Sequence, residues 1–122
     1  MVNTDRIADM WTDASDDYDR IVSRELHNPR DVDHWRHELA MRLGDEPRDV
    51  LDVGCGPGFF SIMLSRLGHR VTSLDASEGM LRAARRNLTW YGIEPHVRHS
   101  DVVTLDDVAD SSVDAVVSRD VV

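Results

Sequence analysis

The sequence has very little cysteine and no excess of basic charge. Cys55 is the only cysteine among 122 residues, so a disulfide within the chain and a multi-cysteine zinc site are excluded. The 14 arginines stand against 23 aspartates and glutamates, which gives a formal net charge of −9. Because an acidic surface repels phosphate backbones, we expect no nucleic-acid partner. The lone thiol suits a reducing compartment, and we therefore expect a cytoplasmic location.

Long hydrophobic runs and clustered metal ligands are also missing. No apolar stretch approaches the ~20 residues that cross a bilayer, and residues 1–10 lack the basic start and apolar centre of a secretory signal. His34 and His37 are three residues apart but have no evident third partner. His96 and His99 fall on opposite faces of a predicted strand. We therefore expect no membrane span and no bound metal.

The hydrophobic pattern changes near residue 47. Before it, Trp35, Leu39 and Leu43 recur every four positions, which predicts one helix between Asn28-Pro29 and Gly44. After it, short apolar segments alternate with helical ones: strands at 50–53, 71–75, 96–100 and 113–118, and helices at 57–67 and from Ser77 to about 91. This alternation predicts an α/β fold with a parallel sheet. We divide the chain into an N-terminal helical region, residues 1–46, and an α/β region, residues 47–122.

A glycine-rich turn, Gly54-Cys-Gly-Pro-Gly58, lies between the first predicted strand and the next helix. Glycines permit a tight turn and close approach of a ligand to the backbone. A dinucleotide-binding turn would have its last glycine at position 59, where this chain has Phe59, and the Gly-Lys-Ser/Thr of a phosphate-binding loop is absent. The turn therefore predicts a ligand site without a pyrophosphate signature. A nucleotide-dependent oxidoreductase is the less favoured alternative.

The segment Val50-Leu-Asp-Val-Gly-Cys-Gly-Pro-Gly58 resembles motif I, D/E-x-G-x-G-x-G, of class I S-adenosylmethionine (SAM) dependent methyltransferases. The resemblance extends over about residues 48–122. It implies a Rossmann-like parallel sheet of order 3-2-1-4, truncated from the seven-stranded methyltransferase fold, and it implies a lid in the N-terminal helices. It also implies SAM as cofactor, S-adenosylhomocysteine (SAH) as product and methyl transfer to an unidentified small-molecule acceptor.

The resemblance implies that residues at the ends of the first two predicted strands contact the cofactor. The backbone of Gly54 and Gly56 is expected to meet the methionine portion of SAM, while Asp52 holds the turn and the methionine amino group. Asp75 is expected to accept both ribose hydroxyls, an arrangement known from Rossmann-like sites. The alternative role for Asp75 is to cap the following helix, although Ser77 is available for that purpose.

Further contacts are implied farther along the chain. Asp101 is expected to bind the adenine amino group, and the Val102 amide an adenine ring nitrogen. Met80 packs on adenine or belongs to the ordinary core, and Tyr18 contacts the cofactor from the lid or is simply buried. The remaining expected cofactor contacts are Cys55, Gly58, Ala76 and Ser118.

The catalytic residue is unknown from the sequence. Asp120 follows the fourth predicted strand and is either a base or a bystander. The Asn/Asp-Pro-Pro-Tyr/Phe pattern of many DNA-base and glutamine methyltransferases is absent there, which argues against those acceptors. The fourth strand, residues 113–118, is apolar and no helix follows it, so we expect a truncated sequence or self-association through this strand. A non-catalytic SAM-binding or interaction module is therefore the alternative function.

Overall fold

A computed structural model describes residues 20, 23–100 and 113–118 of the chain. Its elements in order are α3 (Pro29–Leu43), β1 (Asp49–Val53), α4 (Phe59–Arg66), β2 (Arg70–Asp75), α5 (Glu78–Trp90), β3 (Val97–His99) and β4 (Ala115–Val117). Tyr18, Asp101, Val102 and Asp120 lie outside the described residues. Their expected roles therefore remain predictions.

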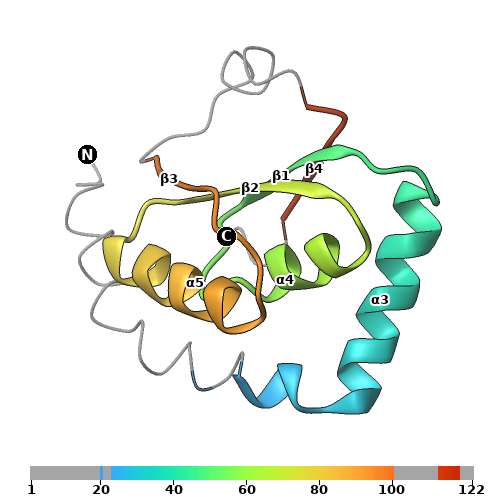
Figure 1. Ribbon diagram of the computed structural model, residues 1–122, viewed down its shortest axis with the longest axis horizontal. Helices are drawn as coiled ribbons and strands as arrows, with labels where there is room; N and C mark the ends of the chain where they lie inside the picture. Colours follow the sequence, from blue (N-terminus) through green and yellow to red (C-terminus); the bar gives the residue numbers. More distant parts are fainter. Residues whose placement is uncertain (1–19, 21–22, 101–112, 119–122) are drawn as a thin grey trace, which may run out of the picture.

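The four described strands form one parallel sheet in the order β3-β2-β1-β4. β1 occupies the centre, with Val53 beside Leu74 of β2 and Leu51 beside Val116 of β4. This confirms the predicted Rossmann-like order 3-2-1-4. Figure 1 shows α4 and α5 on the same side of the sheet, as two successive crossovers of one hand require.

Local capping residues determine where two of the helices begin. The Asn28 side chain accepts hydrogen bonds from the backbone amides of Arg30 and Asp31, and Pro29 occupies the first helical position of α3. The Ser77 hydroxyl accepts from the Met80 amide at 3.2 Å and caps α5. The predicted helix boundaries therefore agree with the structure to within two residues.

The main core lies between the sheet and the helices α3 and α4. Leu39 and Leu43 are buried in it, and the Trp35 ring meets the Phe60 ring edge-on at 5.1 Å between centroids. The predicted helical stripe is thus confirmed as the inner face of α3. Val50 of β1 belongs to the same cluster, which fixes the face that β1 turns toward the helices.

The other face of the sheet carries residues that alternate with this core. Leu51 is buried, whereas Val116 of the edge strand β4 keeps 47% of its surface exposed. Association through β4 stays a prediction. Among the residues that the structure describes, no helix is long and apolar enough to span a membrane.

His69 is a buried titratable group between α4 and β2. Its side chain is 7% exposed, and its Nδ1 atom accepts a hydrogen bond from the Arg48 amide at 3.1 Å. A ring nitrogen that accepts a hydrogen bond carries no proton, so this contact requires the neutral imidazole. Burial lowers the pKa of His69 below 6.5, and the charges of Arg48 and Arg70 lower it further.

We expect His69 to make the fold sensitive to acid. Because the pKa is lower in the folded state, the unfolded chain takes up the proton first, and stability is lost as the pH falls below 6.5. His69→Asn keeps an acceptor near the Nδ1 position but does not titrate. Urea unfolding at about pH 5 and about pH 7.5 should show a smaller acid loss for the variant. Equal acid losses in both proteins would contradict this role.

Candidate functional site

The glycine-rich turn is tied to its surroundings by backbone and side-chain hydrogen bonds. The Cys55 amide donates to the Leu74 carbonyl at 2.9 Å, which joins the turn to the end of β2. The Gly58 amide donates to the Cys55 carbonyl at 3.1 Å and closes the turn. From α5, the Asn87 amide group donates to the Pro57 carbonyl at 2.9 Å. The turn is therefore held at the carboxyl edge of the sheet, where open α/β sheets bind ligands.

All three glycines of the turn have positive φ values, and two of them, Gly56 and Gly58, have different surroundings. At Gly58, φ is +99°, and an added Cβ would lie 3.5 Å from the Ala84 Cα of α5. Glycine is suited to this position because other residues rarely adopt such a positive φ, and because α5 packs against it. At Gly56, φ is +54°, and an added Cβ would meet no atom of the described residues within 4 Å. Among the described residues, the turn thus presents bare backbone to open space at Gly56, which leaves room for a ligand.

Asp75 ends β2 and holds the turn directly. Its Oδ2 atom accepts from the Gly56 amide at 2.9 Å, and its Oδ1 atom accepts from the Ser77 amide at 2.9 Å. Ser77 itself caps α5, so the alternative role of Asp75 as that cap is not what the structure shows. An ionised carboxylate offers about four lone-pair sites. Two backbone bonds therefore leave Asp75 with acceptor capacity for a ligand.

Asp52 lies beneath the turn with 2% of its surface exposed. Its Oδ2 atom accepts from the Ser61 hydroxyl at 2.7 Å, and that hydroxyl lies 2.6 Å from the Ser73 hydroxyl of β2. The Ser61 backbone amide also hydrogen-bonds the carboxyl group. Gly58 has no side chain to cap α4, so Asp52 satisfies donors of the first helical turn in its place.

Burial dominates the titration of Asp52. It raises the pKa of this carboxyl to about 7, against the two Ser61 hydrogen bonds, which lower it. The neighbouring Asp75 charge raises the pKa further. Both protonation states of Asp52 are therefore accessible near neutral pH.

Cys55 forms part of the wall of the turn. Its side chain is buried, and its thiol donates to the Gly56 carbonyl at 3.4 Å. Burial raises the pKa of the thiol far above its usual range, and the charges of Asp52 and Asp75 act in the same direction. The neutral thiol is a poor nucleophile. Cys55 therefore contributes shape to the site rather than covalent chemistry.

The structure brings the turn, Asp75 and Ala76 together at one edge of the sheet. Met80 is buried in the first turn of α5, with 3% of its surface exposed. Ser118 is exposed just beyond β4. Three polar residues that support the turn, Ser61, Ser73 and Asn87, were not predicted from the sequence. The available signal was that Ser61 and Ser73 interrupt otherwise apolar segments.

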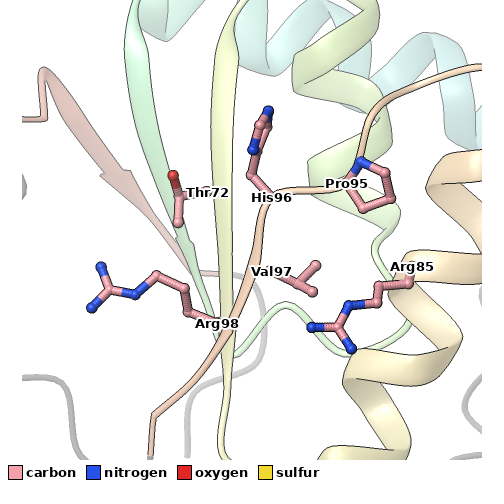
Figure 2. A pocket seen from close by; sticks show the side chains of 6 residues that line it. All are labelled: Thr72, Arg85, Pro95, His96, Val97 and Arg98. Atoms are coloured by element: carbon pink, nitrogen blue, oxygen red, sulfur yellow. The ribbon is translucent and has the colours of Figure 1, made fainter.

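A hollow of about 390 Å³ lies at the edge strand β3 and not at the glycine-rich turn. Figure 2 shows that the side chains of Arg85 and Arg98 extend on opposite sides of β3. Their charges therefore do not converge on a common ligand position. Within the described ranges, no three His, Cys, Asp or Glu side chains gather as metal ligands.

The fold and this edge define the class of protein. A parallel sheet with an open glycine turn after β1 and an acceptor carboxylate at the end of β2 is the arrangement of Rossmann-like domains that bind adenosine-type cofactors. Residues 50–122, more than half of the chain, match the family described as methyltransferase domain. The chain belongs to this family, as a class I SAM-dependent methyltransferase domain. This membership favours the methyltransferase interpretation over the oxidoreductase alternative.

Relatives include biosynthetic enzymes and an RNA-modifying enzyme. The chain is 30% identical over 132 residues to a ubiquinone biosynthesis O-methyltransferase of Dinoroseobacter shibae, covering 99% of this chain and 53% of that protein. It is 36% identical over 85 residues to a malonyl-[acyl-carrier protein] O-methyltransferase of Serratia marcescens, covering 70% and 31%. The Thermus thermophilus 16S rRNA N2 G1207 methyltransferase, solved with AdoMet and guanosine, superposes with a TM-score of 0.58 at 27% identity, covering 69% and 23%. The chain thus spans about half the length, or less, of these relatives.

We expect Ser61→Ala to destabilise the fold by about 1–3 kcal/mol, because Asp52 and Ser73 lose a buried hydrogen-bond partner. Ser65→Ala, one turn later on α4, is the matched control, since the Ser65 hydroxyl only donates to the Ser61 carbonyl. We expect this control to cost less than about 1 kcal/mol. Urea unfolding measures both variants.

The pH dependence of these variants provides a second test. A raised pKa means that the folded state holds the proton longer, so Asp52 lowers stability as the pH rises from 3.8 to about 7. Ser61→Ala raises the pKa further, and its cost should therefore be larger at about pH 8 than at about pH 6. If the loss of stability in Ser61→Ala is the same at both pH values, Ser61 does not influence the ionisation of Asp52.

Proposed function

We propose that the protein is a SAM-dependent methyltransferase that transfers a methyl group to a small-molecule acceptor. The observation that carries this proposal is the bond from the Gly56 amide to the Asp75 carboxylate, which sets an acceptor beside open glycine backbone. Membership of the methyltransferase domain family supports it. The names of two relatives as O-methyltransferases favour an oxygen acceptor, and the net charge of −9 favours a small molecule over nucleic acid.

The residues present fit the cofactor. The open space at Gly56 leaves room for the methionine portion along the backbone of Gly54 and Gly56. Asp75 has lone pairs left for the two ribose hydroxyls. For the adenine, we propose Asp101, Val102 and Met80, with Cys55, Gly58, Ala76, Ser118 and Tyr18 as additional contacts. Asp52 supports the turn from below through Ser61.

When bound, the cofactor supplies a methyl group that is already activated by a sulfonium centre. The task of this chain is then to hold it in line with the acceptor, and such positioning supplies several kcal/mol of the barrier reduction. The glycine-rich turn serves this purpose because hydrogen bonds from Asn87 and to Asp75 hold the backbone on which the cofactor would lie. A base is needed only for a protonated acceptor, and Asp120 is the candidate that we propose.

We propose that the N-terminal region, residues 1–46, is a lid for the site in residues 47–122. The observation behind this is the contact between Trp35 of α3 and Phe60 of α4, the helix that starts at the turn. A cytoplasmic location is part of the same proposal and is supported by a single, buried, free thiol.

Calorimetric titration with SAM and SAH tests the proposed function directly. Asp75→Ala removes the acceptor for the ribose hydroxyls and the bond to Gly56. We expect it to weaken binding about 10- to 100-fold, the effect of losing a charge-assisted hydrogen-bond partner. Absence of binding to the unmodified protein would refute the proposal. An unchanged affinity in the variant would remove Asp75 from the site.

Gly56→Ala tests whether the open backbone is where the ligand approaches. Its control is Gly92→Ala, since φ is +54° at Gly56 and +74° at Gly92, and neither added Cβ meets an atom within 4 Å in the part of the chain that the structure describes. Both variants should lose about 1–2 kcal/mol of stability through backbone strain. Only Gly56→Ala should weaken SAH binding, by about tenfold or more. Equal affinities of the two variants would place the ligand elsewhere.

A further inference from the structure

Asp52 is a buried carboxyl group whose ionisation has no part in the proposed methyl transfer. It stands two residues before the glycine-rich turn, with 2% of its surface exposed. Its hydrogen bonds come from Ser61 at the start of α4, and Ser73 of β2 extends the chain of hydroxyls. The carboxyl group that precedes the turn is therefore shielded from water and lies among the residues that support the turn.

The groups that face Asp52 carry either negative charge or none. Ser61 from α4 and Ser73 from β2 are neutral, and the Cys55 thiol beside it is held in its neutral form. The charged group that acts on it is the Asp75 carboxylate at the end of β2. In the part of the chain that the structure describes, no lysine, arginine or histidine forms an ion pair with Asp52. An ionised Asp52 thus lacks a cationic partner within this part of the protein.

We propose that Asp52 distinguishes the cationic methyl donor from the neutral product by its own ionisation. This inference rests on the proposed function, because it requires SAM and SAH to occupy the glycine-rich turn. Both ligands carry the same amino and carboxylate groups, and they differ by the positive charge of the sulfonium. In a site of low dielectric constant, that charge stabilises an ionised Asp52, whereas the product does not.

The coupling works in both directions. Because the pKa of Asp52 lies at about 7, a ligand that favours the ionised form releases a proton to solvent when it binds near neutral pH. The site recovers that proton from solvent when it holds the neutral product. Donor affinity therefore rises with pH, while product affinity changes little. Asp52 acts here as a specificity-determining residue that favours exchange of product for fresh donor.

Titration calorimetry of the unmodified protein with SAM and with SAH, at about pH 6 and about pH 8, tests this inference. We expect the preference for SAM over SAH to increase about fivefold or more between the two pH values. Buffers of different ionisation enthalpy should show that more protons are released with SAM than with SAH. A preference that is constant within about twofold would overturn the inference.

Variants then assign the effect to Asp52. Asp52→Asn should bind both ligands with a preference that no longer depends on pH. The control is Asp49→Asn, an exposed carboxylate at the opposite end of β1, which should retain the pH dependence. If Asp52→Asn does not fold, Ser61→Ala serves instead, and it should move the midpoint of the pH dependence upward.

The outcomes separate this inference from the proposed function. If neither ligand binds at any pH, both are refuted. If both ligands bind and their ratio is the same at every pH, the proposed function stands and the role of Asp52 is refuted. A pH-dependent ratio that survives in a folded Asp52→Asn would assign the effect to another group and would equally refute this role.

Discussion

The hydrogen bond from the Gly56 amide to the Asp75 carboxylate joins the two segments on which the site depends. It connects the turn after β1 with the end of β2, and the second oxygen of Asp75 reaches the Ser77 amide at the start of α5. One side chain thus sets the relative positions of a turn, a strand end and a helix start. The hydrogen bond from Asn87 to the Pro57 carbonyl further stabilises the turn in the position that this carboxylate establishes.

A second carboxyl group, that of Asp52, supports the same turn from the opposite side. Asp75 is partly accessible and meets backbone amides, whereas Asp52 is buried and meets the first turn of α4. The surroundings of the two groups therefore differ, although the groups belong to neighbouring strands of one sheet. Burial raises the pKa of Asp52 to about 7, so its charge responds to conditions near neutral pH.

Most of the fold could be predicted from the sequence because its signals are local. The glycines, Asn28, Ser77 and the alternation of apolar segments indicate caps, turns and strands without reference to distant residues. The helix expected from residue 57 begins at Phe59, because Gly58 has a φ of +99° that no helix accommodates. The left-handed conformation of Gly58 is a backbone feature that the pattern of apolar residues along the chain does not reveal.

The side-chain network of the site was less accessible to prediction. The acidic position at Asp52 was evident, but its partner Ser61 is nine residues away and faces it only when α4 packs against β1. Asn87 reaches Pro57 across thirty positions for the same reason. Such contacts depend on how elements pack, and sequence periodicity gives only the face on which a residue lies.

The contact between Gly58 and Ala84 sets an upper limit on side-chain size at position 84. A Cβ at Gly58 would already lie 3.5 Å from the Ala84 Cα, and Ala84 itself is fully buried. A larger residue at position 84 would push α5 outward, and Asn87, one turn further along, would move with it. A substitution in the middle of α5 would thus also displace the Pro57 carbonyl, to which Asn87 donates.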